Sequence, residues 1–566
     1  MVRCKKMRRN FVILFFSIVI IGFILRFYNL DTIPHGLDRD EAFLGYNAFS
    51  LIHTGRDMTG NLLPLHLESF LYTPAGYSYI STLPVLLFGL SAFSTRFASA
   101  FFGAITPLFF LMFLLELFKG GEKKYFNTYL ASLVGGVFII FSPWNILLSR
   151  TASVSTIVSF LIVLGLYLFL KARNGSKFIL ILSYLCFFSC LFFYIAPYSV
   201  LPFLIPLIIY FSGKDFKKSK IIHMAGLSII AGVIIFTFLS PKLSLRARSL
   251  SITNYPEVQL KLDQQIREDG THNSPVFLTR VFHNKAVAYP EEFLKNYFSH
   301  FSYDFLFDGQ FYPNRYIFVG ARLLYFVDIL FLLTGLIFIL RNRIKAGYFL
   351  IGWVAIMPLG SAMSSYDIPN MQRILAMSLP ISGISAIGLS YFITALRGWR
   401  RWGLCIVLAT VYLYSIASFL HAYYFHSSIY MPWLRNDGYQ SLVYKISSYQ
   451  DNFKKIIITN RESAPAIFVL FYEKYPASLY QNEVRNSILR DFDRVNFGKY
   501  EFSTEECPAR ETLIDGKKSS TARKDILYVN SSLCESSENL QILDIIKRVD
   551  GSDAFEIVKL RNESEN

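Results

Sequence analysis

Charged residues are scarce in this sequence, which is 17% charged and 53% hydrophobic over its 566 residues. The charges leave long apolar runs between residues 11 and 422, so an ordinary soluble globular protein is excluded. No small-residue cleavage site follows the first apolar run, and we therefore do not interpret that run as a cleaved signal peptide. We expect an α-helical polytopic membrane protein.

Several motifs of soluble enzymes are also missing. The six cysteines form no C-x-x-C pair, which argues against a zinc or thioredoxin-like site. No G-x-x-x-x-G-K-[ST], G-x-G-x-x-G or G-x-S-x-G element stands in a suitable context, so nucleotide hydrolysis and serine-esterase chemistry are disfavoured. No internal repeat is visible, which counts against the inverted-repeat transporters.

About eleven apolar runs have the length and composition of membrane spans. They lie at residues 11–28, 97–118, 129–146, 153–170, 178–194, 196–211, 221–239, 321–340, 347–363, 374–396 and 403–422. Lys and Arg cluster in alternate loops, as the positive-inside rule requires, so the net charge of +16 does not indicate nucleic acid. This pattern predicts a multi-pass protein of the plasma (inner) membrane with a cytoplasmic N-terminus and an extracytoplasmic C-terminus.

We expect two domains. Residues 1–430 form the membrane domain, with a first external loop at 29–96 and a long external loop at 240–320, and residues 431–566 form an extracytoplasmic tail. The tail predicts a small α/β domain with strands at 455–459, 526–529 and 555–560 and helices at 464–472 and 540–547. Its Cys507 and Cys534 would face an oxidising compartment, and the sequence leaves open whether they pair.

The most informative stretch follows the first span and carries three carboxylates, Asp38, Asp40 and Glu41. Apolar residues then recur at helical spacing, which predicts an amphipathic helix over 40–54 at the membrane interface, ended by Gly55. Residues 77–90 are too short for a span and contain Pro84, so we interpret them as a second interfacial helix.

The three acids have a structural and a functional interpretation. Asp38 as N-cap and Glu41 three residues later form an aspartate version of the capping box. That explanation fits Asp40 least, because a further acid adds repulsion at a helix start that is already capped. Asp40 can instead act as general base for a hydroxyl acceptor, or bind a divalent cation.

Cations near the outer ends of spans are the second feature, because the positive-inside rule disfavours them there. They are Arg150, Arg246, Arg248, Arg315, Arg322 and Arg373. Snorkelling or pairing with a nearby acid explains any one of them, whereas together they suggest a lipid-linked phosphate at the outer leaflet. Asp328, in the run at 321–340, is a further candidate with Arg322 as its partner.

These motifs resemble the polyprenyl-phosphate-dependent glycosyltransferases of the GT-C superfamily, beside the protein O-mannosyltransferases (family 39) and aminoarabinose transferases. The resemblance rests on D-E-A-F-L-G-Y-N-A-F-S-L-I-H-T-G-R-D, L-P-L-H-L-E-S-F-L-Y-T-P-A-G-Y-S-Y-I, L-F-G-L-S-A-F-S-T-R-F-A-S-A-F-F-G, F-S-P-W-N-I-L-L-S-R, N-Y-F-S-H-F-S-Y-D-F-L-F and I-P-N-M-Q-R-I-L-A-M-S-L-P, in this order. It implies a GT-C fold and inverting transfer of one sugar from a polyprenyl-phosphate carrier to a glycan, lipid or protein acceptor.

The resemblance also implies residue roles. Asp40 would be the catalytic base with Glu41 supporting it, while Asp38, Arg39, Tyr72, Arg150, Arg315 and Arg373 would bind the donor. Relatives often carry a lysine where this chain has Thr73, and in the aminoarabinose branch a glutamate where it has Tyr72. They also often have Pro-His where this chain has Pro369-Asn370. These departures leave the sugar and the use of a metal open, with Glu68 and His66 as metal candidates.

One alternative is a transporter or flippase of lipid-linked saccharides that performs no chemistry. Such a protein needs charged residues along a path through the middle of the bilayer. The predicted spans contain few charges at mid-depth, which favours the enzyme.

Overall fold

The computed structural model describes residues 17, 19–68, 72–120, 126–212, 219–396, 398–486, 495–514, 517–535 and 538–561. By its internal contacts the chain divides into two compact units, each described by itself below. The first comprises Met1–Tyr28, Ser99–Ser149 and Ser153–Leu420, and the second comprises Asn29–Ala98, Arg150–Ala152 and His421–Asn566. These units are defined by contacts and do not test the predicted domain boundary at residues 430–431, which stays a prediction.

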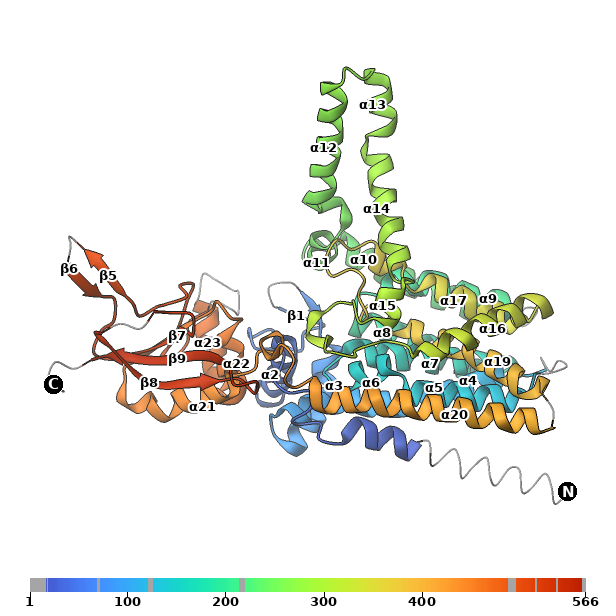
Figure 1. Ribbon diagram of the computed structural model, residues 1–566, viewed down its shortest axis with the longest axis horizontal. Helices are drawn as coiled ribbons and strands as arrows, with labels where there is room; N and C mark the ends of the chain where they lie inside the picture. Colours follow the sequence, from blue (N-terminus) through green and yellow to red (C-terminus); the bar gives the residue numbers. More distant parts are fainter. Residues whose placement is uncertain are drawn as a thin grey trace. The chain divides into compact units, whose positions relative to one another are not determined.

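The first unit is a bundle of apolar helices (Figure 1). Its helices are α4 (Ala92–Leu117, of which the first turns belong to the second unit), α5 (Thr128–Phe141), α6 (Pro143–Ser149), α7 (Val154–Lys171), α8 (Lys177–Phe193), α9 (Pro197–Ser212), α10 (Lys220–Leu239), α16 (Phe326–Asn342), α17 (Lys345–Ile356), α18 (Leu359–Ala362), α19 (Ser378–Ala395) and α20 (Gly398–His421). Half of α5 and most of α7 and α19 are buried, while the apolar surface of α20 is largely exposed, as expected where lipid surrounds a bundle.

Fewer helices meet the length and hydropathy of a span than the sequence suggested. Among the described residues five do so: α4, α7, α10, Leu375–Ala395 and Gly398–His426; a bent pair, α5 and α6 at 51°, makes up to six. The runs at 178–194 and 196–211 form the shorter apolar helices α8 and α9, and the run at 347–363 divides into α17 and α18. The chain is therefore a multi-pass membrane protein, and the count of about eleven spans is not confirmed. The predicted first span lies partly outside the described residues and continues as helix through Phe27.

The long loop at 240–320 is mostly helical. It contains α11 (Leu245–Ser249), α12 (Pro256–Thr271), α13 (Val276–Phe282), α14 (Lys285–Ser299) and α15 (Tyr303–Phe307), with single 3₁₀ turns at Ile252–Asn254 and Asn314–Tyr316. In Figure 1 α12 and α13–α14 form a long hairpin that projects from the bundle, approximately across the direction of its helices.

The second unit combines the first external loop with the tail. The loop contributes α2 (Arg39–Thr54), the short strands β1 (His66–Leu67) and β2 (Thr73–Pro74), and α3 (Gly76–Phe88). The tail contributes α21 (Tyr439–Tyr449), β3 (Lys455–Thr459), α22 (Pro465–Tyr472), α23 (Ala477–Asn486), β4 (Tyr500–Ser503), β5 (Glu511–Ile514), β6 (Lys517–Ser520), β7 (Ile526–Ser531), β8 (Leu540–Lys547) and β9 (Asp553–Leu560).

The tail is built on a mixed five-stranded sheet in the order β4-β3-β7-β9-β8. Strand β3 pairs in parallel with β4 and β7, whereas β9 pairs antiparallel with β7 and β8. Helices α21 and α22 pack on this sheet through Tyr439, whose ring lies 4.3 Å from that of Phe468 and 5.0 Å from that of Phe555. The expected α/β domain is confirmed as a mixed β-sheet domain with helices.

The helix expected at 540–547 is wrong, because this segment is strand β8. It pairs with β9 along its length, and the register shifts between Ile542 and Asp544 and again between Ile546 and Lys547. Such irregularities break the two-residue alternation that marks a strand in a sequence. The apolar spacing therefore looked helical, and pairing with a neighbouring strand decided the outcome.

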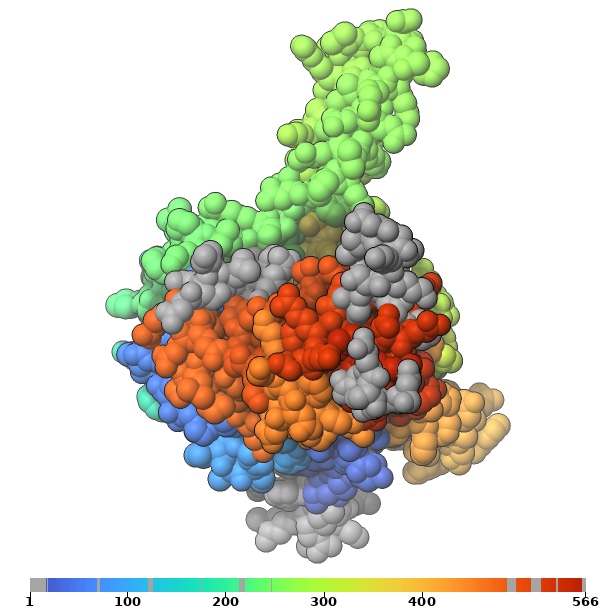
Figure 2. Space-filling view, turned by 90° about the vertical axis from the view of Figure 1, so that its left-hand side faces the viewer, coloured from blue at the N-terminus to red at the C-terminus, as the bar shows by residue number. Residues whose placement is uncertain are grey.

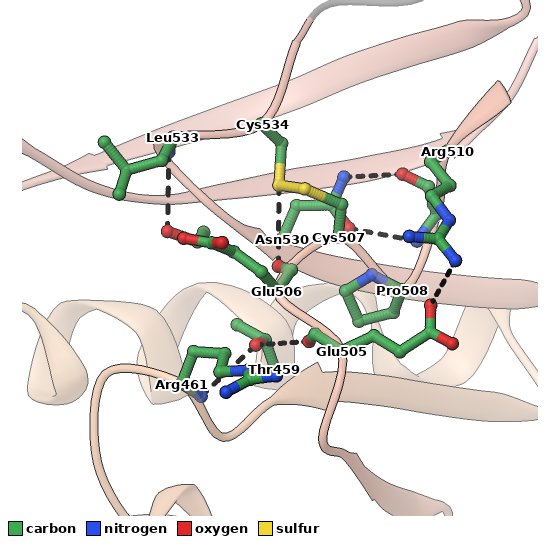
Figure 3. Close-up of a disulfide and its surroundings, with 12 residues drawn as sticks. Thr459, Arg461, Glu505, Glu506, Cys507, Pro508, Arg510, Asn530, Leu533 and Cys534 are labelled. Carbon is green, nitrogen blue, oxygen red and sulfur yellow. Dashed lines mark hydrogen bonds and ion pairs between the residues drawn. A yellow bond between two sulfur atoms is a disulfide. The ribbon is translucent and has the colours of Figure 1, made fainter.

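Cys507 and Cys534 form a disulfide that joins the segment before β5 to the segment after β7 (Figure 3). Near it, the side chain of Asn530 donates to the carbonyl of Ala509 at 2.8 Å and accepts from the Ala509 N–H at 3.1 Å. The disulfide and the hydrogen bonds of Asn530 hold the segment before β5 against β7. The two cysteines, whose pairing the sequence left open, are therefore paired in the fold.

Candidate active site

Helix α2 begins with the predicted capping box. The Asp38 side chain caps the first turn, including the Asp40 N–H at 2.9 Å, and the Asp38 N–H donates to Glu41 Oε2 at 3.3 Å. At the other end Gly55 adopts a left-handed conformation (φ 65°), which glycine reaches without the penalty of a Cβ. Helix α2 is thus confirmed within one residue of the predicted start.

Helix α2 is more enclosed than a surface helix, because α3, α22 and α23 of the same unit contact it. Gly45 marks the closest approach, since a Cβ there would lie 2.4 Å from Thr95 and 2.8 Å from Phe471. Gln481 of α23 donates to the hydroxyls of Ser50 and Thr54, each at 2.9 Å. The apolar positions that suggested a membrane-facing stripe are therefore covered largely by protein, and a place for α2 at the bilayer interface stays a prediction.

Glu41 is buried and paired with Arg96, which follows the first turn of α4. Arg96 Nε lies 3.0 Å from Oε1 and Arg96 Nη2 lies 2.9 Å from Oε2, a bidentate arrangement. The Ala152 N–H donates to the same carboxylate at 2.7 Å. Burial by itself raises the pKa of Glu41, but Arg96 and the two backbone donors hold that pKa below its ordinary value.

The guanidinium of Arg96 also organises the turn before α2. Its Nη atoms donate to the carbonyls of Leu30 at 3.2 Å, Pro34 at 3.0 Å and Gly36 at 2.6 Å. Glu41 and Arg96 together therefore fix the first turn of α2 against three separate segments of the unit.

Asp40 differs from its neighbour because its side chain is exposed. It stands in the first turn of α2, where negative charge is favoured by the helix dipole. The residues on both sides, Arg39 and Glu41, contrast with each other: Arg39 is exposed and Glu41 is fixed in the interior. The first turn of α2 thus carries an exposed carboxylate, that of Asp40, and is fixed in place by the buried carboxylate of Glu41.

Arg150 lies in the same unit, and its side chain is buried. It donates to the carbonyl of Ile33 at 2.9 Å and to the hydroxyl of Tyr423 at 3.2 Å, and it lies 5.1 Å from the centre of the Tyr424 ring. This buried residue therefore supports the turn before α2 through the Ile33 carbonyl. A role in donor binding stays a prediction.

Glu68 and Tyr72 come together near β1 and β2. Tyr72 OH lies 3.5 Å from Glu68 Oε1, and the Asn61 amide donates to Oε2 at 3.2 Å. His66 is on β1, where burial lowers its pKa. Within the described part of the chain no group of three or more His, Cys, Asp or Glu side chains suits a metal ion. Glu68 and His66 do not belong to such a group, and we assign no step to a metal.

Arg315 and Arg373 belong to the first unit, where one polar cluster connects them. Arg315 Nη2 donates to the Gln372 side chain at 3.4 Å, and Arg373 Nη1 donates to the carbonyl of Tyr366 at 2.7 Å. The Asn370 side chain accepts from the N–H groups of Gln372 and Arg373, each at 3.0 Å. The Asn370 side chain thus shapes the turn that carries Arg373.

His300 stabilises the turn at Asn370 through hydrogen bonds. Its Nδ1 lies 2.7 Å from the Asn296 carbonyl, and its Nε2 lies 2.9 Å from the Ser361 hydroxyl and accepts from the Asn370 N–H. Because a carbonyl can only accept and an N–H can only donate, these contacts describe a neutral ring protonated at Nδ1. Burial lowers the pKa of His300 to about 4, so the neutral form prevails near pH 7.

Asp328 accepts from the Tyr325 N–H at 2.9 Å and from the Tyr412 hydroxyl. It lines a largely apolar cavity of about 430 Å³ between α5, α16, α19 and α20. Arg322, its expected partner, lies over the Phe326 ring at 5.5 Å and donates to the carbonyl of Gly320. Of the remaining arginines, Arg248 lies on α11, and the side chain of Arg246 is outside the described side chains.

Sequence reasoning missed Arg96, Tyr423 and Tyr424. Arg96 carries the same signal as the arginines it selected, a cation at the outer end of a predicted span, and it stands within a motif of the family resemblance. The two tyrosines have no signal in the sequence, because their role depends on a segment more than 250 residues from Arg150.

Comparison with known proteins finds relatives by structure but none by sequence. No protein-family model and no curated protein matches the chain. The structure matches ArnT from Cupriavidus metallidurans in the apo state with a TM-score of 0.55 and 11% identity, over 97% of this chain and 98% of that one. ArnT bound to undecaprenyl phosphate matches with a TM-score of 0.52 and 12% identity over the same shares.

The oligosaccharyltransferase of Archaeoglobus fulgidus matches more weakly, with a TM-score of 0.49 and 14% identity over 82% of this chain and 63% of that one. At that score the likeness supports no conclusion about this chain. The two ArnT matches cover nearly the whole chain, and they show that it shares the fold of ArnT, with a helical membrane part and a β-sheet domain.

Proposed function

We propose that this protein is a polyprenyl-phosphate-dependent glycosyltransferase that transfers one sugar, with inversion, at the outer face of the plasma membrane. The observation that carries the proposal is the exposed Asp40 carboxylate in the first turn of α2, next to the buried and bidentately held Glu41. A general base must be held in one geometry and must still reach its substrate. Here Glu41 fixes the geometry of the turn, and Asp40 is exposed to the substrate.

In the proposed reaction, a hydroxyl oxygen of the acceptor attacks the anomeric carbon of the donor sugar. The bond from that carbon to the phosphate oxygen breaks, and the polyprenyl phosphate leaves with the bonding electron pair. Asp40 accepts the hydroxyl proton as the new glycosidic bond forms. Attack opposite to the leaving phosphate inverts the configuration at the anomeric carbon.

The leaving phosphate needs cations, and Arg315 and Arg373 are the candidates in the first unit. The ArnT structure with bound undecaprenyl phosphate supports a phosphate-linked lipid as the donor, since that protein shares the fold. Guanidinium groups bind phosphate oxygens with charge-assisted hydrogen bonds. Arg39 and Tyr72 are further donor-binding candidates, whereas Arg150 and Glu41 are positioning residues in this proposal.

The outer face is proposed on two grounds. The disulfide between Cys507 and Cys534 is typical of an oxidising compartment, and the tail carries it. The basic residues of alternate loops favour a cytoplasmic N-terminus. Both support a position outside the cytoplasm for the tail and the first loop, which belong to one compact unit.

Purified protein in lipid nanodiscs should release undecaprenyl phosphate from undecaprenyl-phosphate-linked ¹⁴C-labelled hexose or pentose when a membrane extract supplies the acceptor. Asp40→Asn should lower the rate by about 10²- to 10⁴-fold, the usual contribution of a general base. Asp525→Asn is the matched control, because this aspartate on the tail is exposed and pairs with the exposed Lys454.

Full activity in Asp40→Asn would remove the proposed base. Translocation of the labelled donor across the bilayer without release of undecaprenyl phosphate would favour the flippase instead.

A further inference from the structure

The hairpin of the long external loop has a core of its own. Val258 and Leu262 of α12 are buried, and Lys261 lies 3.4 Å from Glu291 of α14. Near the tip His283 lies 3.5 Å from Asp269. These contacts align α12 with α13–α14, which form one green projection in Figure 2.

One face of α14 is apolar and exposed. Val287, Leu294 and Phe298 are separated by seven and four residues, so they fall on one side of the helix. Phe298 is 62% exposed, and no described element covers this side. Lys285 is also exposed, and its two-residue separation from Val287 places it on nearly the opposite side.

The tip repeats this arrangement. In α13 the apolar residues Phe277, Leu278, Val281 and Phe282 are spaced so that they share one face, and all are exposed. Phe277 is 72% exposed, and no residue of α13 is buried. So large an unpartnered apolar surface on a loop needs an occupant.

The base of the hairpin shows which occupant that is. Asn296 donates toward the carbonyls of Ala362 and Ser364, and Tyr297 donates to the carbonyl of Ala355 at 2.8 Å. These acceptors lie at the ends of α17 and α18, where the bundle ends. From there the hairpin runs across the direction of the bundle helices (Figure 1). A rod that starts at the ends of membrane helices and runs across them follows the bilayer surface.

We propose that this hairpin lies at the membrane–water interface on the outer face of the plasma membrane, with the exposed apolar residues of α13 and α14 inserted among lipid acyl chains. Amphipathic helices in this position bury their apolar face about 5–10 Å below the surface. Acidic and basic residues are nearly balanced along the hairpin, so apolar contact rather than attraction to anionic headgroups holds it. The inference does not depend on the proposed glycosyltransferase activity.

The test uses the full chain in nanodiscs of phosphatidylcholine and phosphatidylglycerol, with or without brominated acyl chains. All cysteines except Cys507 and Cys534 are replaced, and bimane is attached to Val287→Cys, Phe277→Cys or the matched control Lys285→Cys. Bromine quenches the label only on contact. We expect at least a two-fold loss of fluorescence at positions 277 and 287 and little change at position 285.

Equal quenching at positions 285 and 287 would overturn the proposal, because the hairpin would then have no lipid-facing side. Absence of quenching at both 277 and 287 would also overturn it and would leave a protein partner as the occupant. Phe277→Asp together with Phe282→Asp gives a second measurement, since these exposed changes do not disturb the hairpin core. The double variant should abolish the quenching of a label at position 287, because the charged tip then no longer inserts among the acyl chains.

Discussion

Two buried titratable groups, Glu41 in the second unit and His300 in the first, respond to burial in opposite ways. Glu41 stays charged because Arg96 meets both of its oxygens and backbone N–H groups add to the pair. His300 stays neutral because its partners are a carbonyl, a hydroxyl and one backbone N–H, and its nearby charge, on Arg373, is of the same sign as its own cation. Burial disfavours charge at both positions, so the partner decides the protonation state.

The comparison also separates two ways of building a polar site. A buried ion pair fixes the turn that presents Asp40, whereas a neutral hydrogen-bonded ring fixes the turn that presents Arg373. The first depends on charge balance and the second on hydrogen-bond geometry. Breaking each therefore has different consequences.

Removing one member of the ion pair should have the largest effect. Glu41→Ala leaves the Arg96 cation buried without its carboxylate, which costs about 3–5 kcal/mol of the free energy of unfolding. Urea titration in detergent micelles measures this value. The double variant Glu41→Leu with Arg96→Met should recover much of the loss, and a double variant less stable than Glu41→Ala would contradict the assigned pairing.

His300 should make the first unit sensitive to mild acid. Its pKa is about 4 in the folded protein and near 6.5 when unfolded, so the unfolded state binds more protons between these values. Stability contributed by this group is complete above pH 6.5 and is lost as the pH falls toward 4, by roughly 3 kcal/mol in all. The difference in stability between wild type and His300→Gln, followed from pH 7.5 to 4.5, checks it. A difference that does not change with pH would contradict a neutral buried ring.

Glu41 titrates in a lower window. Its pKa lies below the ordinary value of 4.5, so its stabilising contribution is present above that pH and is lost as the pH falls through the folded value. Wild type and Glu41→Gln should therefore keep a constant difference in stability from pH 7 to pH 5 and converge only in stronger acid. Convergence already near pH 6 would mean that Arg96 does not hold the charge.

The cap of α2 should contribute least. Asp38→Ala removes one N-cap acceptor and costs about 1 kcal/mol, while Asp38→Asn should retain most of the cap. Activity should fall more than stability in Asp38→Ala if the turn positions Asp40. Thermal unfolding and the release of undecaprenyl phosphate, measured on the same samples, separate the two effects.

The local features of the fold follow from residues close together in the sequence. The sequence predicted α2, its capping box and its glycine stop, because capping is an interaction among neighbours in the chain. It predicted β3, β7 and β9 of the tail and the membrane helices as apolar runs, since burial in lipid or in a sheet requires them. The family resemblance implied the overall architecture, and the structural match to ArnT shows a shared fold.

The partners of the buried side chains and of strand β8 depend on the folded chain. Glu41 finds Arg96 from another helix, Arg150 finds Tyr423 far along the chain, and β8 becomes a strand because β9 offers a pairing edge. Each of these depends on a contact between distant segments, and residue spacing carries no record of such contacts. The same reason explains why α2 is enclosed by the tail when its apolar stripe suggested a membrane.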